Sequence, residues 1–272
     1  MKLSSITVRP APKTELPAAT TATAAPRSNQ VASTAVGGDD FVGRPGRSGP
    51  APTDPTGPTD PTQPTDPWTG KEDAALKSAL KSYVTDGKTS VSYSRARDIM
   101  FGDVDNHDGK VKCVYTDREI TASRPPNSND MNVEHTWPQS KGATGTAKSD
   151  MHHLFPTDSR SNSIRGNHPF GIVANVKESW PSGAKFGTDA SGRTVFEPPA
   201  DHKGNVARAL FYFSTTYSKP ITPQEEAVLK EWNLADPVDT AEIERNDRVQ
   251  GYQKTRNPFI DHPQLAARID DF

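Results

Sequence analysis

The sequence predicts an α+β protein: one mostly helical domain that contains a strand–loop–helix unit and follows a disordered N-terminal tail. Three observations predict this class. The first 68 residues consist largely of Ala, Thr, Pro and Ser, with few large apolar side chains. Apolar residues at helical spacing begin only after that segment. Short segments of strand character then interrupt the helical pattern between residues 109 and 139.

The tail, residues 1–68, is predicted to end in a semi-rigid spacer. Twelve of the 25 prolines fall within the first 67 residues, and residues 52–67 repeat a six-residue unit nearly three times, PTDPTGPTDPTQPTDP. Proline fixes φ and removes a backbone donor, so this repeat favours extended polyproline II and cannot join the interior of a sheet. A passive linker and a tail for export or partner recognition are both compatible with this composition.

Composition and charge limit the classes of function that this protein can have. The net charge of −2 gives no global attraction to nucleic acid or membrane, so a nucleic-acid enzyme would need a local basic groove. No run of 18 apolar residues exists, which excludes a membrane-spanning helix. A single cysteine, Cys113, permits no internal disulfide and fits a cytoplasmic or an exported protein. The first residues, MKLSSITVRPAPK, lack the apolar run of a secretory signal, so we expect export to need another route or another start site.

The first elements after the tail are two helices and a strand. Residues 72–84 place Leu76 and Leu80 on one helical face, and residues 92–101 predict a second helix. Residues 109–116 alternate as a strand after the turn DNHDG. That turn resembles a calcium loop, but its glycine is the seventh residue from Asp103 instead of the sixth, which favours a simple turn.

The next elements are a strand that ends near the proline of MNVEHTWPQ, a small-residue loop, and a short helix over residues 159–165. Residues 204–217 predict a core helix. Thr222 as cap and Pro223 at the first position begin another helix that ends near residue 233. Residues 241–253 predict the last main helix.

Chemically versatile side chains concentrate between residues 132 and 168. A neutral imidazole such as that of His135 can take a proton from water at neutral pH. Mg²⁺ prefers oxygen ligands and keeps several waters, so Glu134 and Asn162 would suffice to hold it. Arg165, one helical turn after Asn162, can reach a phosphate oxygen or form a structural ion pair. These residue types together suit phosphodiester hydrolysis.

Two further groups keep alternative interpretations open. Asp150 with His152 and His153 resembles a transition-metal cluster, although histidines in such a place more often pack and bond to carbonyl groups. A rim of basic side chains flanks the proposed site and forms either a path for a nucleic-acid backbone or a solvated surface: Lys141, Lys148, Arg160 and Arg165.

Three motifs, NVEHTWPQS, SDMHHLFPTD and NSIRGNHPFG, in this order and spacing, closely resemble the bacterial endonuclease I family of extracellular or periplasmic nucleases. The resemblance continues through FEPPADHKGNVARALFYF and EWNLADPVDTAEIERND to TRNPFIDHP and covers roughly residues 75–265. It implies a ββα-metal (His-Me) finger within a catalytic domain over residues 69–272. It also implies cleavage of DNA, often RNA too, with little sequence preference and with 5′-phosphate products.

The resemblance assigns roles to individual residues. It makes His135 the general base, and Glu134 and Asn162 the ligands of magnesium, for which manganese or calcium can substitute. Arg165 is the second catalytic candidate, and no organic cofactor is expected. The absence of an evident signal peptide and the single cysteine depart from the family pattern.

We therefore predict a secreted or periplasmic, monomeric endonuclease that binds DNA, and RNA as a further substrate, through phosphates and has no membrane contact. Two rivals remain: a nucleic-acid-binding module with a degenerate active site, and a zinc-dependent hydrolase that uses Asp150, His152 and His153.

Overall fold

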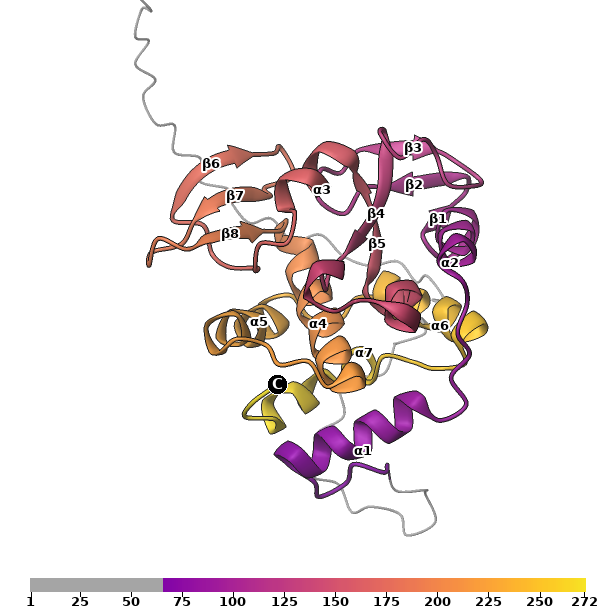
Figure 1. The fold of residues 1–272 in the computed structure, drawn as a ribbon, viewed down its shortest axis with the longest axis vertical. Helices are drawn as coiled ribbons and strands as arrows, with labels where there is room; N and C mark the ends of the chain where they lie inside the picture. Colours follow the sequence, from indigo (N-terminus) through magenta and orange to yellow (C-terminus); the bar gives the residue numbers. More distant parts are fainter. Residues whose placement is uncertain (1–65) are drawn as a thin grey trace, which may run out of the picture. The chain divides into compact units, whose positions relative to one another are not determined.

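The computed structural model describes residues 66–272 (Figure 1). They form helices and three small antiparallel sheets, which confirms the α+β class. The predicted tail lies outside the described residues apart from its last three. Trp68 is buried, and its ring packs edge-on against Tyr83, with centroids 5.0 Å apart. The folded part therefore includes this tryptophan. No helix within residues 66–272 is long and apolar enough to cross a membrane.

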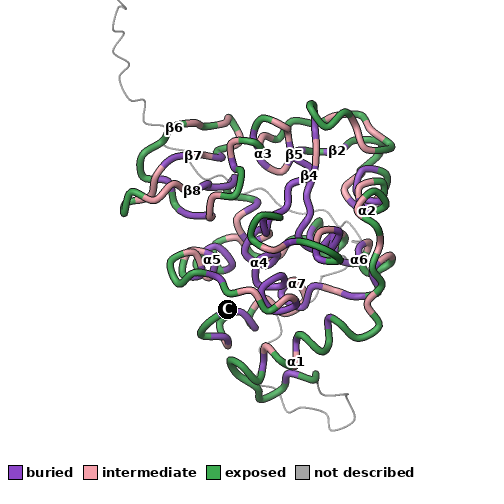
Figure 2. The backbone as a smooth tube through the Cα atoms, in the orientation of Figure 1, coloured by how far each residue is buried: buried purple, intermediate pink, exposed green. Residues whose placement is uncertain are grey.

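Helix α4 lies at the centre of the described core. The helices are α1 (Asp73–Thr85), α2 (Tyr93–Ile99), α3 (Ser159–Arg165), α4 (Lys203–Tyr217), α5 (Pro223–Ala235), α6 (Thr240–Gln253) and α7 (Pro258–Asp261). Helix α4 packs against α1, α5 and α7, and nearly all its side chains are buried (Figure 2). This burial agrees with the core helix that the sequence predicts over residues 204–217. From α1, Leu76 and Leu80 contribute the buried stripe that their spacing predicts.

The caps of the helices follow the sequence. Thr222 accepts a hydrogen bond from the Glu225 amide at the start of α5, and Pro223 occupies its first turn. Helix α2 begins after its cap Ser92 but ends at Ile99, two residues before the predicted end. A π-helical turn, η1 (Met100–Val104), continues it, because the backbone bonding there widens to five residues.

The strands form three separate sheets. They are β1 (Asn106–His107), β2 (Lys110–Lys112) and β3 (Glu119–Thr121), then β4 (Met131–His135) and β5 (Leu154–Asp158), then β6 (Asn175–Ser179), β7 (Lys185–Thr188) and β8 (Thr194–Glu197). Asp108 and Gly109 both have positive φ, 52° and 79°, between β1 and β2. This is the two-residue hairpin turn that an Asp-Gly pair favours, as the turn prediction expected.

Strand β5 was not predicted, although it completes the sheet that carries the candidate site. Pro156 lies in the middle of β5, opposite Val133. A proline in a sequence argues against a strand there, because it has no backbone N–H to donate to the neighbouring strand. In a sheet of two strands that loss is tolerated, and the Pro156 carbonyl accepts the Val114 amide at 3.0 Å. Sheet β6–β8 was also unpredicted, since β6 is mostly exposed and shows no apolar alternation.

Arg208 fastens α4 to α5 and α6 by a buried ion pair. Its Nε and Nη2 donate to the Glu242 carboxylate at 2.7 and 2.6 Å, and Nη1 donates to the Asn233 side chain and the Asp236 carbonyl. Gly204 permits this approach, because a Cβ there would lie 2.1 Å from the Asp236 carbonyl oxygen. The helical core thus depends on a guanidinium that is shielded from water.

Replacing Arg208 by methionine should therefore destabilise the protein by about 3–5 kcal/mol, because Glu242 would remain buried without a partner. Urea denaturation measures this change. Arg160→Met is the matched control, since Arg160 and Glu178 form an exposed pair worth about 0–1 kcal/mol. Equal losses in both variants would contradict a stabilising role for the buried pair.

Candidate active site

Strands β4 and β5 and helix α3 follow one another in a compact ββα unit (Figure 1). Side chains alternate along a strand, so Asn132 and Glu134 share one face of β4. Helix α3 covers that face: the Asn162 amide donates to Asn132 Oδ1 at 2.6 Å, and Arg165 Nε lies 3.2 Å from Glu134 Oε1. His135 ends the strand on the other face. The structure thus brings the four predicted site residues together around one strand.

The imidazole of His135 is held in one tautomer. Its Nε2 lies 3.0 Å from the carbonyl oxygen of Lys148, and a carbonyl can only accept, so Nε2 carries the proton. The lone pair is then on Nδ1, whose one hydrogen-bond partner within residues 66–272 is the Gln139 side-chain amide, at the long distance of 3.4 Å. Burial, followed by the nearby His153, lowers the pKa of His135 to about 3. The arrangement supplies a neutral ring whose basic nitrogen is engaged only by the long contact from Gln139 among the described residues.

Glu134 has one engaged and one free oxygen. The Tyr115 hydroxyl donates to Oε1 at 3.1 Å, and Arg165 Nε contacts the same atom. Oε2 has no hydrogen bond or ion pair within residues 66–272. Burial raises the pKa of Glu134, while Arg165 and Tyr115 oppose that rise. A cation at the free oxygen would complete the compensation of this buried carboxylate.

Asn162 also presents a free oxygen. Its Nδ2 donates both to Asn132 Oδ1 and, at 3.2 Å, to the Val133 carbonyl, whereas its Oδ1 has no partner in the described part of the chain. A hard divalent cation that keeps several waters needs few protein oxygens. Within residues 66–272 no group of three or more His, Cys, Asp or Glu side chains is arranged to hold a metal. The free oxygens of Glu134 and Asn162 fit such a sparse magnesium site.

Arg165 faces inward instead of toward a phosphate. Its side chain is 2% exposed, with Nη1 donating to the His135 carbonyl at 3.3 Å and Nη2 to the Thr136 carbonyl at 2.7 Å. The guanidinium also lies 4.5 Å from the ring centroid of Phe170. Of the two roles that the sequence left open, this geometry favours the structural one: Arg165 fixes the backbone that carries His135.

Trp137, two residues after His135, is held in place by the core. Trp137 stacks on Phe213 of α4 with centroids 4.8 Å apart and planes 12° apart. Its indole nitrogen donates to the Lys141 carbonyl at 3.0 Å. The turn η2 (Gln139–Lys141), which places Gln139 beside His135, is therefore held against the core.

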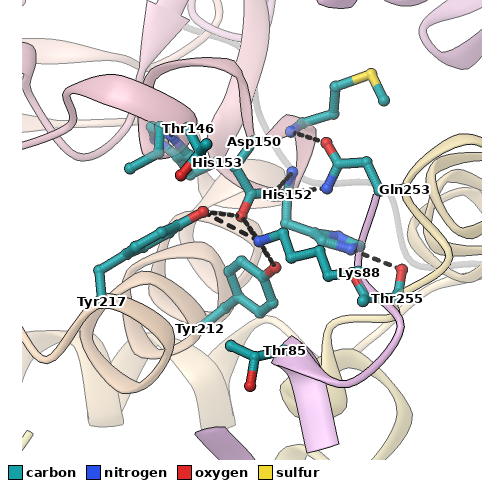
Figure 3. A network of polar contacts seen from close by, with 12 residues as sticks. Thr85, Lys88, Thr146, Asp150, His152, His153, Tyr212, Tyr217, Gln253 and Thr255 are labelled. Carbon is teal, nitrogen blue, oxygen red and sulfur yellow. Dashed lines mark hydrogen bonds and ion pairs between the residues drawn. The ribbon is translucent and has the colours of Figure 1, made fainter. Parts of the chain in front are cut away.

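Asp150 lies at the centre of a buried polar network (Figure 3). Its carboxylate accepts hydrogen bonds from Lys88 at 2.5 Å, Tyr212 at 3.0 Å, Tyr217 at 2.7 Å and Gln253 at 2.8 Å. Burial would raise its pKa, but the Lys88 ammonium, followed by the nearby His152 and His153, holds that pKa well below its ordinary value. The network fixes the segment that ends at Asp150 and includes the Lys148 carbonyl.

The neighbouring histidines do not converge with Asp150 on a common centre. His152 Nε2 lies 3.0 Å from the Thr255 carbonyl, and His153 Nε2 lies 2.7 Å from the Ala147 carbonyl. Burial lowers the pKa of each ring to about 4, so both are neutral donors to backbone oxygens. This geometry does not support the zinc-centre alternative. Instead, His153 packs edge-on beside His135, with ring centroids 5.6 Å apart.

Sequence reasoning missed Tyr115, Gln139 and Lys88. Tyr115 follows Cys113 at strand spacing, which could have placed it on the buried face, and Gln139 lies within the quoted motif. For Lys88 no pattern pointed to Asp150, because 62 residues separate them. The predicted basic rim is also smaller than expected, since Arg160 pairs with Glu178 and Arg165 is buried.

Comparisons with known proteins agree on one family. The model of the Endonuclease I family matches residues 69–264. An extracellular ribonuclease of Bacillus amyloliquefaciens is 35% identical over 226 residues, which cover 74% of this chain and 75% of that protein. An extracellular deoxyribonuclease of Aeromonas hydrophila is 33% identical over 112 residues, 41% of this chain and 48% of the relative. A periplasmic deoxyribonuclease of the same organism is 31% identical over 112 residues, 41% of this chain and 47% of that protein.

The Asp150 network should make stability depend on acidity. Because the folded-state pKa of Asp150 is lowered, its contribution is complete above the unfolded value of about 3.9 and is lost progressively as the pH falls from that value through the much lower folded-state pKa. Asp150→Asn should cost about 3–5 kcal/mol at pH 7, since Lys88 loses its partner, and should weaken the loss of stability below pH 4.

Urea unfolding between pH 7 and pH 3 measures both effects. Tyr217→Phe is the control, because it removes one hydrogen bond to the carboxylate, worth about 1.5–3 kcal/mol, and retains the ion pair and its pH dependence. An unchanged acid dependence in Asp150→Asn would show that another carboxylate is responsible.

Proposed function

Because this chain belongs to the endonuclease I family, we propose that it is a magnesium-dependent endonuclease that hydrolyses phosphodiester bonds with little sequence preference. The names of its relatives include both ribonucleases and deoxyribonucleases, which supports RNA and DNA as substrates. The ββα unit of β4, β5 and α3 is proposed to be a His-Me finger. The observation that carries this proposal is the fixed tautomer of His135, which leaves the Nδ1 lone pair to act as a base, with only the long contact from the Gln139 amide at 3.4 Å upon it among the described residues.

In the proposed mechanism, His135 Nδ1 takes a proton from the water that attacks the scissile phosphorus. The bond from phosphorus to the 3′-oxygen breaks, and the product keeps a 5′-phosphate. The Nε2–H group remains on the Lys148 carbonyl, which steadies the ring as it becomes positively charged. Arg165 keeps the carbonyls of His135 and Thr136 in place and thereby acts as a positioning residue.

The metal would be held by Glu134 and Asn162 through the oxygens that have no partner in the described structure. When bound, magnesium would neutralise negative charge on the phosphate and on the departing oxygen. Tyr115 and Arg165 orient the Glu134 carboxylate, and Asn132 orients the Asn162 amide by accepting a hydrogen bond from its nitrogen. The protein is also proposed to act as a monomer. Export is also proposed, since relatives are named extracellular or periplasmic.

His135→Ala should lower the rate of plasmid cleavage by about 10²–10⁴, because the attacking water loses its base. Gel electrophoresis of plasmid DNA and of RNA in the presence of Mg²⁺ measures this change. His107→Ala is the control. Because His107 is exposed in β1, this variant should cleave at the wild-type rate. Wild-type cleavage by His135→Ala would refute the proposed base, and inactivity of the unaltered protein on both substrates would favour the binding-module alternative.

Asn162→Ala should raise the magnesium concentration needed for half-maximal cleavage by about 10-fold or more, because one of two protein ligands is lost. Asn162→Asp keeps an oxygen at the same position and should require less magnesium than the alanine variant. Chelation by EDTA should stop cleavage in every variant. The assignment of Asn162 as a ligand fails if the alanine variant has the magnesium requirement of the wild type.

A further inference from the structure

A pocket of about 430 Å³ opens between α1 and the end of α4, away from the ββα unit. Lys77, Lys81 and Lys219 line it together with hydroxyl groups that include Ser214 and Ser218. Lys81 Nζ donates to Ser218 Oγ at 2.8 Å, and Lys77 Nζ donates to the Asp271 carbonyl. Ammonium and hydroxyl groups are the donors that proteins commonly direct at phosphate oxygens. The walls of this pocket therefore suit an anion.

The positive charge of the pocket is not neutralised by neighbouring carboxylates. Within residues 66–272, Lys77, Lys81 and Lys219 form no ion pair with an aspartate or glutamate, and neither does Lys141. Asp271 is the acidic residue that lines the pocket, and it engages Lys77 through its backbone oxygen. In a chain whose net charge is −2, four lysines without a close ion pair among the described residues form a local positive field, although the charge of Glu225 acts on Lys141.

A continuous set of contacts joins this pocket to the proposed base. Gln139 lies 3.4 Å from His135 Nδ1, and its carbonyl accepts the Gly142 amide at 3.1 Å. Gly142 has a φ of 112°, and a Cβ there would lie 3.0 Å from Lys219 Cε. Lys219 therefore passes directly over the turn η2 that begins beside the base. Its chain neighbour Ser218 binds Lys81.

We propose that Lys141, Lys219, Lys81 and Lys77, here termed the lysine track, bind backbone phosphates of the nucleic-acid strand beyond the cleaved bond. This inference rests on the proposed nuclease function and adds a substrate-binding surface outside the ββα unit. Lys77 and Lys81 are four residues apart on α1, which places them on one face about 5–6 Å apart at Cβ. Contacts of this kind fix a strand without reading its bases, in keeping with low sequence preference.

The salt dependence of binding tests the lysine track. In a His135→Ala background, which slows cleavage by about 10²–10⁴, Lys77→Gln/Lys81→Gln should reduce the slope of log K against log salt by about 1.8 for duplex DNA and about 1.4 for single-stranded RNA. Lys219→Gln alone should reduce the duplex slope by about 0.9. Fluorescence anisotropy with a labelled duplex and a labelled RNA strand measures each slope.

The control pair is Lys110→Gln/Lys254→Gln. Lys110 bonds to the Thr121 hydroxyl and Lys254 to the Gly251 carbonyl, so this pair loses the same charge and the same kinds of hydrogen bond as the track pair. Its slope should equal that of the background. Equal slopes for the two pairs, or no nucleic-acid binding by the background protein, would overturn the lysine track.

Plasmid cleavage by the unaltered protein separates the two proposals. If it cleaves plasmid while the track pair keeps the background slope, the lysine track is refuted and the nuclease function stands. If it cleaves neither DNA nor RNA, the nuclease function is refuted, and the lysine track, which rests on that function, is refuted with it.

Discussion

The buried guanidinium of Arg165 ties the two halves of the candidate site together, because it contacts Glu134 through Nε and the carbonyl oxygens of His135 and Thr136 through its terminal nitrogens. A charged group that is shielded from water requires oxygen partners on nearly every donor. Helix α3 carries both Arg165 and Asn162, so satisfying the guanidinium also sets Asn162 beside β4. The relation between strand and helix is therefore fixed by an electrostatic requirement.

Burial has opposite effects on the two acidic or basic groups beside that arginine. It lowers the pKa of His135 and so preserves a neutral ring, and it raises the pKa of Glu134, which Arg165 and Tyr115 only partly oppose. The tautomer of the ring is then chosen by a backbone oxygen, that of Lys148. Asp150 anchors this segment to helices α4 and α6 and to Lys88, which follows α1, so contacts beyond the ββα unit help to decide which ring nitrogen carries the proton.

Charge in this protein is organised locally instead of globally. Many arginines form ion pairs with carboxylates, as Arg208 does with Glu242 and Arg160 does with Glu178. The lysines of the lysine track lack such partners among the described residues. A nearly neutral chain can in this way present a local positive surface that would attract a polyanion.

The sequence by itself determined the helix starts at Ser92 and Thr222, helix α3 and the strand that carries His135, since caps and apolar spacing depend on near neighbours along the chain. It also placed Glu134 and Asn162 among the candidate ligands through motifs. Only the tertiary structure decided that Pro156 pairs in a strand, that Arg165 turns inward, and that Lys88 neutralises Asp150. Those outcomes depend on which donors and acceptors meet across 20 to 60 or more residues, and local periodicity carries no information about such encounters.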